Sequence, residues 1–211
     1  MIIAIDGPSA SGKGTLARRI AGRLSFAHLD TGKIYRAVGM AVIASGGDPT
    51  DEVVALAAAR IIEPTFLENP ELLGDAAAKA ASKVAVIPGV RAELLKFQRD
   101  FAKRPPGDAK GAVLDGRDIG TVVCPDADVK LYIMASTEVR AKRRHKELLD
   151  RGEESIYARV LQDMKDRDEL DSSRSISPLK PAEGAIILDT SELDADQAFQ
   201  AVLAEIGKRG R

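Results

Sequence analysis

Short apolar runs alternate along this chain with longer segments in which apolar residues recur every three or four positions. The short runs predict strands at 2–5, 27–30, 112–114, 129–133 and 185–188. The periodic segments predict helices at 13–24, 32–45, 137–151 and 195–208. Alternation of this kind predicts an α/β fold, a parallel sheet with helices on both faces. Four of the runs are nearly all apolar, as strands buried on both faces are.

Two stretches depart from this alternation. Residues 47–104 hold three helix-like segments, at 51–62, 70–86 and 88–103, and no convincing strand. Residues 153–174 form a charged, helix-like run. Both are predicted to be insertions on the sheet, so the predicted core consists of 1–46, 105–152 and 175–211.

Composition narrows the classes of function. The chain has 211 residues, of which 45% are hydrophobic and 30% charged, with a net charge of −1. Without an excess of basic residues, a nucleic-acid polymer is not an expected partner. No apolar run approaches the roughly 18 residues of a membrane span, and the N-terminus lacks the basic region of a signal peptide. We therefore expect a cytoplasmic protein without a membrane partner. Nothing in the sequence indicates an assembly device, so a monomer is the default expectation.

The single cysteine, Cys124, is expected to be a buried apolar side chain.

The strongest motif lies between the first predicted strand and helix. It consists of Gly7, Pro8, Ser9, Ala10, Ser11, Gly12, Lys13, Gly14 and Thr15. The spacing fits G-x-x-x-x-G-K in the context that a phosphate-binding loop requires. Glycines let backbone N–H groups turn toward phosphate oxygens, the helix N-terminus adds positive potential, and Lys13 brings a full charge. This loop predicts nucleotide binding.

The residue after Lys13 departs from the usual motif. Most such loops place a Ser or Thr there to bind Mg²⁺, whereas this chain has Gly14 and then Thr15. The "GKGT" form resembles nucleoside monophosphate kinases, in which nucleotide phosphates and water hold the metal and carboxylates act through water. Asp115, which ends a buried strand, is the candidate for that carboxylate.

Three further clusters of charged residues follow predicted strands or lie on predicted helices. They are the segments 30–36, 114–121 and 166–174. Arg36 lies early in the second helix, and Arg117 and Asp118 lie in a glycine-flanked loop, where a purely structural ion pair is the alternative. Arg167, Asp171 and Arg174 share one helix face, for which a solvated, salt-bridged helix is the alternative. Arg140, Arg143 and Arg144 also share a face, and we expect them to suit phosphates rather than protein carboxylates.

Taken together and in this order, the motifs resemble the bacterial cytidylate kinase family. The matching segments are IDGPSASGKGT, LDTGKIYR, AASKVAVIPGVR, LDGRDIGTVVCPDADVKLY and RDELDSSRSISPL. The resemblance covers nearly the whole chain. It implies a P-loop core with a five-stranded parallel sheet, a helical monophosphate-binding insertion at 47–104 and a helical, mobile lid at 153–174. It also implies ATP-dependent phosphorylation of CMP and dCMP with Mg²⁺, as part of pyrimidine nucleotide metabolism.

The resemblance also implies roles for individual residues. Ser82, Arg91 and Asp118 would face the cytosine, and Arg36 and Arg117 would hold the acceptor phosphate. Arg167, Asp171 and Arg174 would hold sugar and phosphate, and Thr31 belongs to the substrate-binding set. Lys13, Arg117, Arg167 and Arg174 form the catalytic set. One departure is that residues 63–76 are short and strand-free, where many family members have extra strands.

The expected chemistry needs no general base, because a monophosphate oxygen is already anionic near neutral pH. His28 and His145 are therefore interpreted as core and surface residues, and catalysis as positioning with charge neutralisation. Other readings remain: a GTP-dependent switch, a P-loop kinase for another small molecule, and a non-catalytic nucleotide-binding module. The switch lacks its N-K-x-D motif, since the only asparagine, Asn69, precedes Pro70.

Overall fold

The computed structural model of the protein describes residues 1–209, with all their side chains except those of 64, 65, 208 and 209. Gly210 and Arg211, at the end of the predicted core segment 175–211, lie outside the described residues. Residues 1–209 contain five strands: β1 (Ile2–Asp6), β2 (Ala27–Asp30), β3 (Ala112–Gly116), β4 (Val129–Met134) and β5 (Ile186–Asp189). They form one sheet in the order β2-β3-β1-β4-β5. The predicted five-stranded α/β fold is confirmed.

The register of the sheet brings functional segments to one edge. β1 pairs in parallel with β3 and with β4, so that Ile5 lies opposite Asp115 on one side and Leu131 on the other. β4 pairs in parallel with β5. Because parallel strands end at the same edge, the residues that follow β1 and β3 lie at the carboxyl edge where open α/β sheets bind ligands.

The chain forms two compact units, one of residues 1–28 with those from Pro105 onward, and one of Leu29–Arg104. The predicted division into core, insertion at 47–104 and lid stays a prediction.

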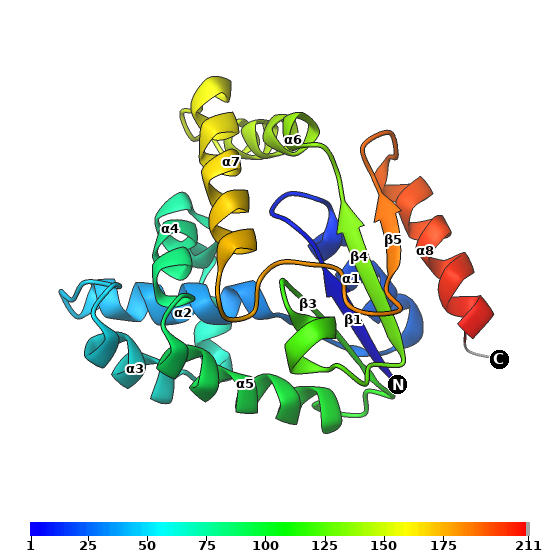
Figure 1. Cartoon of the computed structure of the whole chain (residues 1–211), viewed down its shortest axis with the longest axis horizontal. Helices are drawn as coiled ribbons and strands as arrows, with labels where there is room; N and C mark the ends of the chain where they lie inside the picture. The colour runs from blue at the N-terminus through cyan, green and yellow to red at the C-terminus, as the bar shows by residue number, and fades with distance from the viewer. Residues whose placement is uncertain (210–211) are drawn as a thin grey trace. The chain divides into compact units, whose positions relative to one another are not determined.

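The first unit holds most of the sheet. Its helices are α1 (Lys13–Leu24), the short π-helix η3 (Ile119–Val123), α6 (Thr137–Asp150), α7 (Tyr157–Ser173) and α8 (Ala195–Arg209). Apolar residues of β1, β3 and β4 pack against α1 and α8 in one core cluster. A second, smaller cluster joins α6 to α7 through Leu148, Val160 and Met164. Figure 1 shows α8 beside β5 and α7 crossing near α6.

The second unit is helical. It contains α2 (Thr31–Ala44), α3 (Glu52–Arg60), the 3₁₀ helices η1 (Pro64–Glu68) and η2 (Pro70–Leu73), α4 (Asp75–Val84) and α5 (Pro88–Lys103). The single helix predicted at 70–86 is wrong, because it is divided into η2 and α4 at Gly74, whose extended backbone caps α4. Asn69 accepts a hydrogen bond from the backbone of Glu71, so the predicted cap begins a short 3₁₀ helix.

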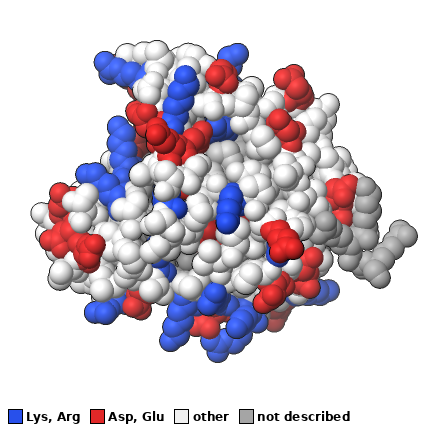
Figure 2. Space-filling model, in the orientation of Figure 1, with Lys and Arg blue, Asp and Glu red and all other residues white. Residues whose placement is uncertain are grey.

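The distribution of surface charge and the burial of the cysteine agree with what the composition predicts. Figure 2 shows basic and acidic side chains interspersed over the face that it presents. Cys124 is buried, as expected. Within residues 1–209, none of the helices is long and apolar enough to cross a bilayer.

Candidate functional site

The loop between β1 and α1 has the backbone of a phosphate-binding loop. A Cβ at Gly7 would lie 2.0 Å from the carbonyl oxygen of Ile133, so only glycine fits there. Ala10 and Gly12 have positive φ values of 57° and 91°, which turn the loop into the start of α1. The Nζ atom of Lys13 donates to the carbonyl oxygen of Pro8 at 3.1 Å, so the lysine side chain folds back over the loop. The geometry therefore supports the predicted use of Gly7–Thr15 for phosphates.

Asp115 is the residue before the last of β3 and lies beside this loop. A Cβ at Gly14 would lie 3.7 Å from Asp115 Oδ2, while Asp115 Oδ1 lies 2.7 Å from His28 Nε2. A carboxylate only accepts, so His28 Nε2 carries the hydrogen of this bond when Asp115 is ionised. His28 is thus largely buried, in keeping with its interpretation as a core residue, and it also holds one oxygen of Asp115 by a hydrogen bond that the sequence did not predict. His145, by contrast, lies 2.8 Å from Ser155 Oγ.

The donor set suits a metal ion that arrives with a nucleotide. Across the part of the chain that the structure describes, no three His, Cys, Asp or Glu side chains gather closely enough to hold an ion. Gly14 offers no hydroxyl, and the nearby Asp115 supplies one carboxylate. These residues are compatible with Mg²⁺ carried by phosphates and contacted through water, which stays a prediction.

A second buried carboxylate, Asp6, ends β1 immediately before the phosphate loop. It is 2% exposed, and it accepts hydrogen bonds from the backbone N–H groups of Ile119 at 2.7 Å and Gly120 at 2.8 Å. The pKa of Asp6 is raised to about 6, because burial and the charge of Asp118 raise it by more than the two backbone hydrogen bonds and the charge of Lys13 lower it. Asp118 itself is buried and caps η3, which begins at Ile119.

Three arginines converge on the buried Asp171 near the end of α7. Arg117 Nε lies 2.8 Å and Arg167 Nε 3.9 Å from Asp171 Oδ2, and Arg174 Nη2 lies 2.5 Å from Oδ1. Burial raises the pKa of Asp171, but the charges of Arg117, Arg174 and Arg167 outweigh it and hold this pKa below its ordinary value. The prediction that Arg174 shares a helix face with Arg167 and Asp171 is wrong, because α7 ends at Ser173 and the backbone of Arg174 is not helical. The solvated surface helix considered as an alternative is therefore wrong for this cluster, because Asp171 is 1% exposed.

The arginines of α6 do not behave as expected. Arg140 is buried, pairs with Asp168 through Nη1 at 3.1 Å and Nη2 at 2.5 Å, and donates to the carbonyl oxygen of Ser9 at 3.3 Å. Arg143 donates to the carbonyl oxygen of Thr190, and Arg144 pairs with Glu147. The expectation that these arginines need no carboxylate partner is wrong for Arg140 and Arg144. Arg140 instead connects α7 to the phosphate loop.

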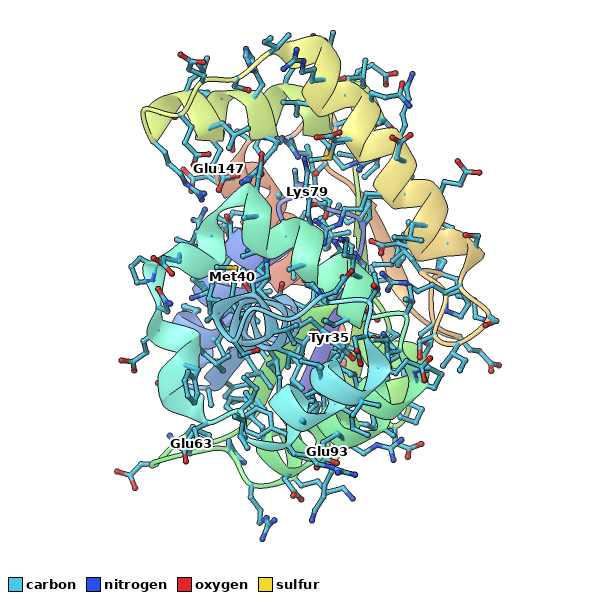
Figure 3. The ribbon with its side chains drawn as sticks, turned by 90° about the vertical axis from the view of Figure 1, so that its left-hand side faces the viewer. Tyr35, Met40, Glu63, Lys79, Glu93 and Glu147 are labelled. Carbon is cyan, nitrogen blue, oxygen red and sulfur yellow. The ribbon has the colours of Figure 1, made fainter. Side chains whose placement is uncertain are left out.

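The remaining predicted residues lie in the helical unit. Arg36 Nη1 donates to the carbonyl oxygen of Leu72 in η2 at 3.0 Å, so the short segment at 63–76 helps to orient Arg36. Arg91 donates to the carbonyl oxygen of Ala85 at 3.1 Å, and its guanidinium lies 5.5 Å from the centre of the ring of Tyr35, which Figure 3 labels on α2. Thr31, at the start of α2, is buried. Ser82 Oγ donates to the carbonyl oxygen of Ala78 on α4.

The structure thus gathers Lys13, Asp115, Arg117, Asp118, Arg167, Asp171 and Arg174 in one unit, and Thr31, Arg36, Ser82 and Arg91 in the other. The sequence did not predict the hydrogen bonds and ion pairs that the structure shows around the candidate site for Asp6, His28, Arg140 and Asp168. One signal was available for Asp6, because an acidic residue directly after an apolar strand and before the phosphate loop needs a buried partner.

Comparisons with known proteins agree on one family. The family model described as Cytidylate kinase matches residues 3–208. A cytidylate kinase of Paramagnetospirillum magneticum is 62% identical over 99% of this chain and 98% of its own length. One of Rhodospirillum rubrum is 60% identical over 96% of this chain and 95% of its own. A crystal structure of an uncharacterised protein from Eubacterium ventriosum covers 98% of both chains with a TM-score of 0.54 and 14% identity, which supports the fold alone.

Proposed function

Because the chain belongs to the cytidylate kinase family, we propose that it transfers the γ-phosphoryl group of ATP to CMP and dCMP, giving ADP with CDP or dCDP. The observation that carries the proposal is the convergence of Arg117, Arg167 and Arg174 on Asp171, in the same unit as the phosphate loop. Guanidinium groups are the side chains best suited to phosphate.

On the donor side, Gly7–Thr15 would bind the ATP phosphates through backbone N–H groups, and Lys13 would place its charge on the β- and γ-phosphates. When bound, Mg²⁺ neutralises phosphate charge. Asp115 would contact the hydration shell of the ion with Oδ2, while His28 holds Oδ1.

On the acceptor side, Arg36 and Arg117 would hold the monophosphate, and Arg167, Asp171 and Arg174 the sugar and phosphate. Ser82, Arg91 and Asp118 would read the cytosine, and Thr31 would also bind the substrate. A carboxylate accepts hydrogen bonds only, so Asp118 suits the N4 amino donor of cytosine and disfavours the O4 acceptor of uracil.

Transfer then requires alignment and charge neutralisation. The attacking oxygen of CMP is already anionic, so no side chain must remove a proton from it. Donor and acceptor phosphates repel each other, and Lys13 with the arginines would offset that repulsion. We propose that segment 153–174 acts as a lid that excludes water when both nucleotides are bound, which limits ATP hydrolysis.

We further propose that the enzyme works in the cytoplasm, where its nucleotide substrates are found, and that it acts as a monomer.

The proposal is tested by measuring ADP formation from ATP and Mg²⁺ with a panel of acceptors: CMP, dCMP, UMP, AMP and GMP. We expect CMP and dCMP to give the highest kcat/KM. A higher kcat/KM for another monophosphate, or turnover that is independent of the acceptor, would overturn the assignment.

A further inference from the structure

One buried carboxylate joins the donor loop to the acceptor-binding loop within the first unit. Asp6 is the last residue of β1 and precedes Gly7, the first residue of the phosphate loop. Its two carboxylate oxygens accept the N–H groups of Ile119 and Gly120 at 2.7 and 2.8 Å. These N–H groups belong to the first turn of η3, which directly follows Arg117 and Asp118.

The N–H groups of this turn need an external acceptor. The first N–H groups of any helix lack a partner within it, and a buried one left unpaired is costly. In η3 the later N–H groups of Val122 and Val123 bond to the carbonyl oxygen of Asp118. Asp6 accepts the N–H groups of Ile119 and Gly120 at the start of this turn, and a carboxylate is the strongest acceptor for that task.

Gly120 leaves room for this contact. A Cβ at Gly120 would lie 3.0 Å from Ala182 Cβ and 3.4 Å from Asp6 Oδ2. A larger residue would therefore press on Ala182 and lie directly against the carboxylate that holds the turn.

We infer that Asp6 is a positioning residue that fixes Arg117 and Asp118 relative to the phosphate loop, and thereby sets the affinity for CMP and the preference for cytosine over uracil. The inference rests on the proposed function, in which Arg117 holds the acceptor phosphate and Asp118 reads the base. Asp6 acts through the η3 backbone and touches neither nucleotide in this account.

The test compares Asp6→Asn with the wild type. The asparagine keeps the size of the side chain and one acceptor oxygen, but turns an NH₂ donor toward one of the two N–H groups. We expect the KM for CMP to rise about tenfold and the CMP-to-UMP ratio of kcat/KM to fall by a similar factor. The Kd for ATP, measured by calorimetry without acceptor, should change less than about twofold. If Asp6 had only a structural role, the substitution would lower the stability of the protein without raising the KM for CMP more than the Kd for ATP.

Two further variants control the experiment. Asp128→Asn removes a carboxylate that accepts the N–H of Ile2 at 2.6 Å, at the opposite end of β1, and should leave both nucleotides unaffected. Gly120→Ala disturbs the junction from its other side and should shift the same quantities as Asp6→Asn, to a smaller extent. If circular dichroism shows that Asp6→Asn does not fold, Gly120→Ala still tests the inference.

The outcomes separate the inference from the proposed function. If the wild type phosphorylates CMP while a folded Asp6→Asn or Gly120→Ala retains its KM for CMP and its base preference, the positioning role is refuted. Equal losses for ATP and CMP would refute it as well. If the wild type itself does not prefer CMP, the proposed function fails instead.

Discussion

Replacing Asp171 with asparagine tests whether the arginine cluster depends on one buried charge. The substitution keeps the shape of the side chain but removes the charge that faces Arg117, Arg167 and Arg174. Breaking a buried ion pair from one side costs about 3–5 kcal/mol, because the remaining charge stays buried. The side chains of Arg117 and Arg167 are 17% and 24% exposed and can recover some hydration. We therefore expect a loss near the lower end, about 3 kcal/mol in the free energy of unfolding.

Urea denaturation at pH 7 measures this loss, and its pH dependence provides a second check. The pKa of folded Asp171 lies below its ordinary value of 3.8, so its contribution is present above that value and is lost as the pH falls through the folded pKa. The difference between wild type and Asp171→Asn should therefore shrink as the pH falls below about 4. Asp163→Asn, at an exposed position on the same helix, is the matched control and should stay within about 0.5 kcal/mol of the wild type. A similarly small change for Asp171→Asn at pH 7 would refute the reasoning.

Further predictions concern single side chains. Lys13→Ala should lower kcat at least about 100-fold in a protein that folds normally by circular dichroism, because it removes a full charge from the phosphates; near-normal turnover would contradict the role. Asp118→Ala should narrow the CMP-to-UMP ratio of kcat/KM by lowering CMP use, and a variant with the full preference would show that another residue reads the base. His28→Leu removes the imidazole that bonds Asp115 Oδ1 and should weaken Mn²⁺ binding to the enzyme–ADP complex about tenfold, as measured by electron paramagnetic resonance. His28→Gln should retain most of the Mn²⁺ affinity. Equal Mn²⁺ affinities of the two variants would show that His28 does not position Asp115. The pKa of Asp6 is raised from 3.8 to about 6, so its contribution to stability falls as the pH rises through this window. Relative to Asp6→Asn, the wild type should thus lose roughly 2 kcal/mol between pH 4 and 7 in urea titrations. A difference that does not change with pH would argue against the raised pKa.

Much of the fold follows from local pattern. β1 is a short apolar run that is buried on both faces, and α1 and α5 begin and end where the sequence predicts. The phosphate loop is equally local, because its glycines and lysine are consecutive. Gly74 shows the limit of this approach: the helical pattern of 70–86 runs through it, yet the backbone there is extended and begins a new helix.

The side-chain contacts around the candidate site could not be predicted from local sequence pattern. His28 and Asp115 are 87 positions apart, and Asp6 and Gly120 are 114 apart. Spacing along a helix shows which residues share a face, but not which element covers that face. Arg140 therefore looked available for a phosphate, whereas α7 places Asp168 against it. Contacts of this kind depend on the packing of α6 on α7 and on the register of β1 with β3.

The central claim, phosphoryl transfer to a cytosine monophosphate, is tested most directly by following the transferred group. The enzyme is incubated with [γ-³²P]ATP, Mg²⁺ and an equimolar mixture of CMP and UMP, and the products are separated by chromatography. The account predicts that the label appears in CDP in excess over UDP, with one nucleoside diphosphate formed from an acceptor for each ADP. Label recovered mainly as inorganic phosphate, or mainly in UDP, would contradict it.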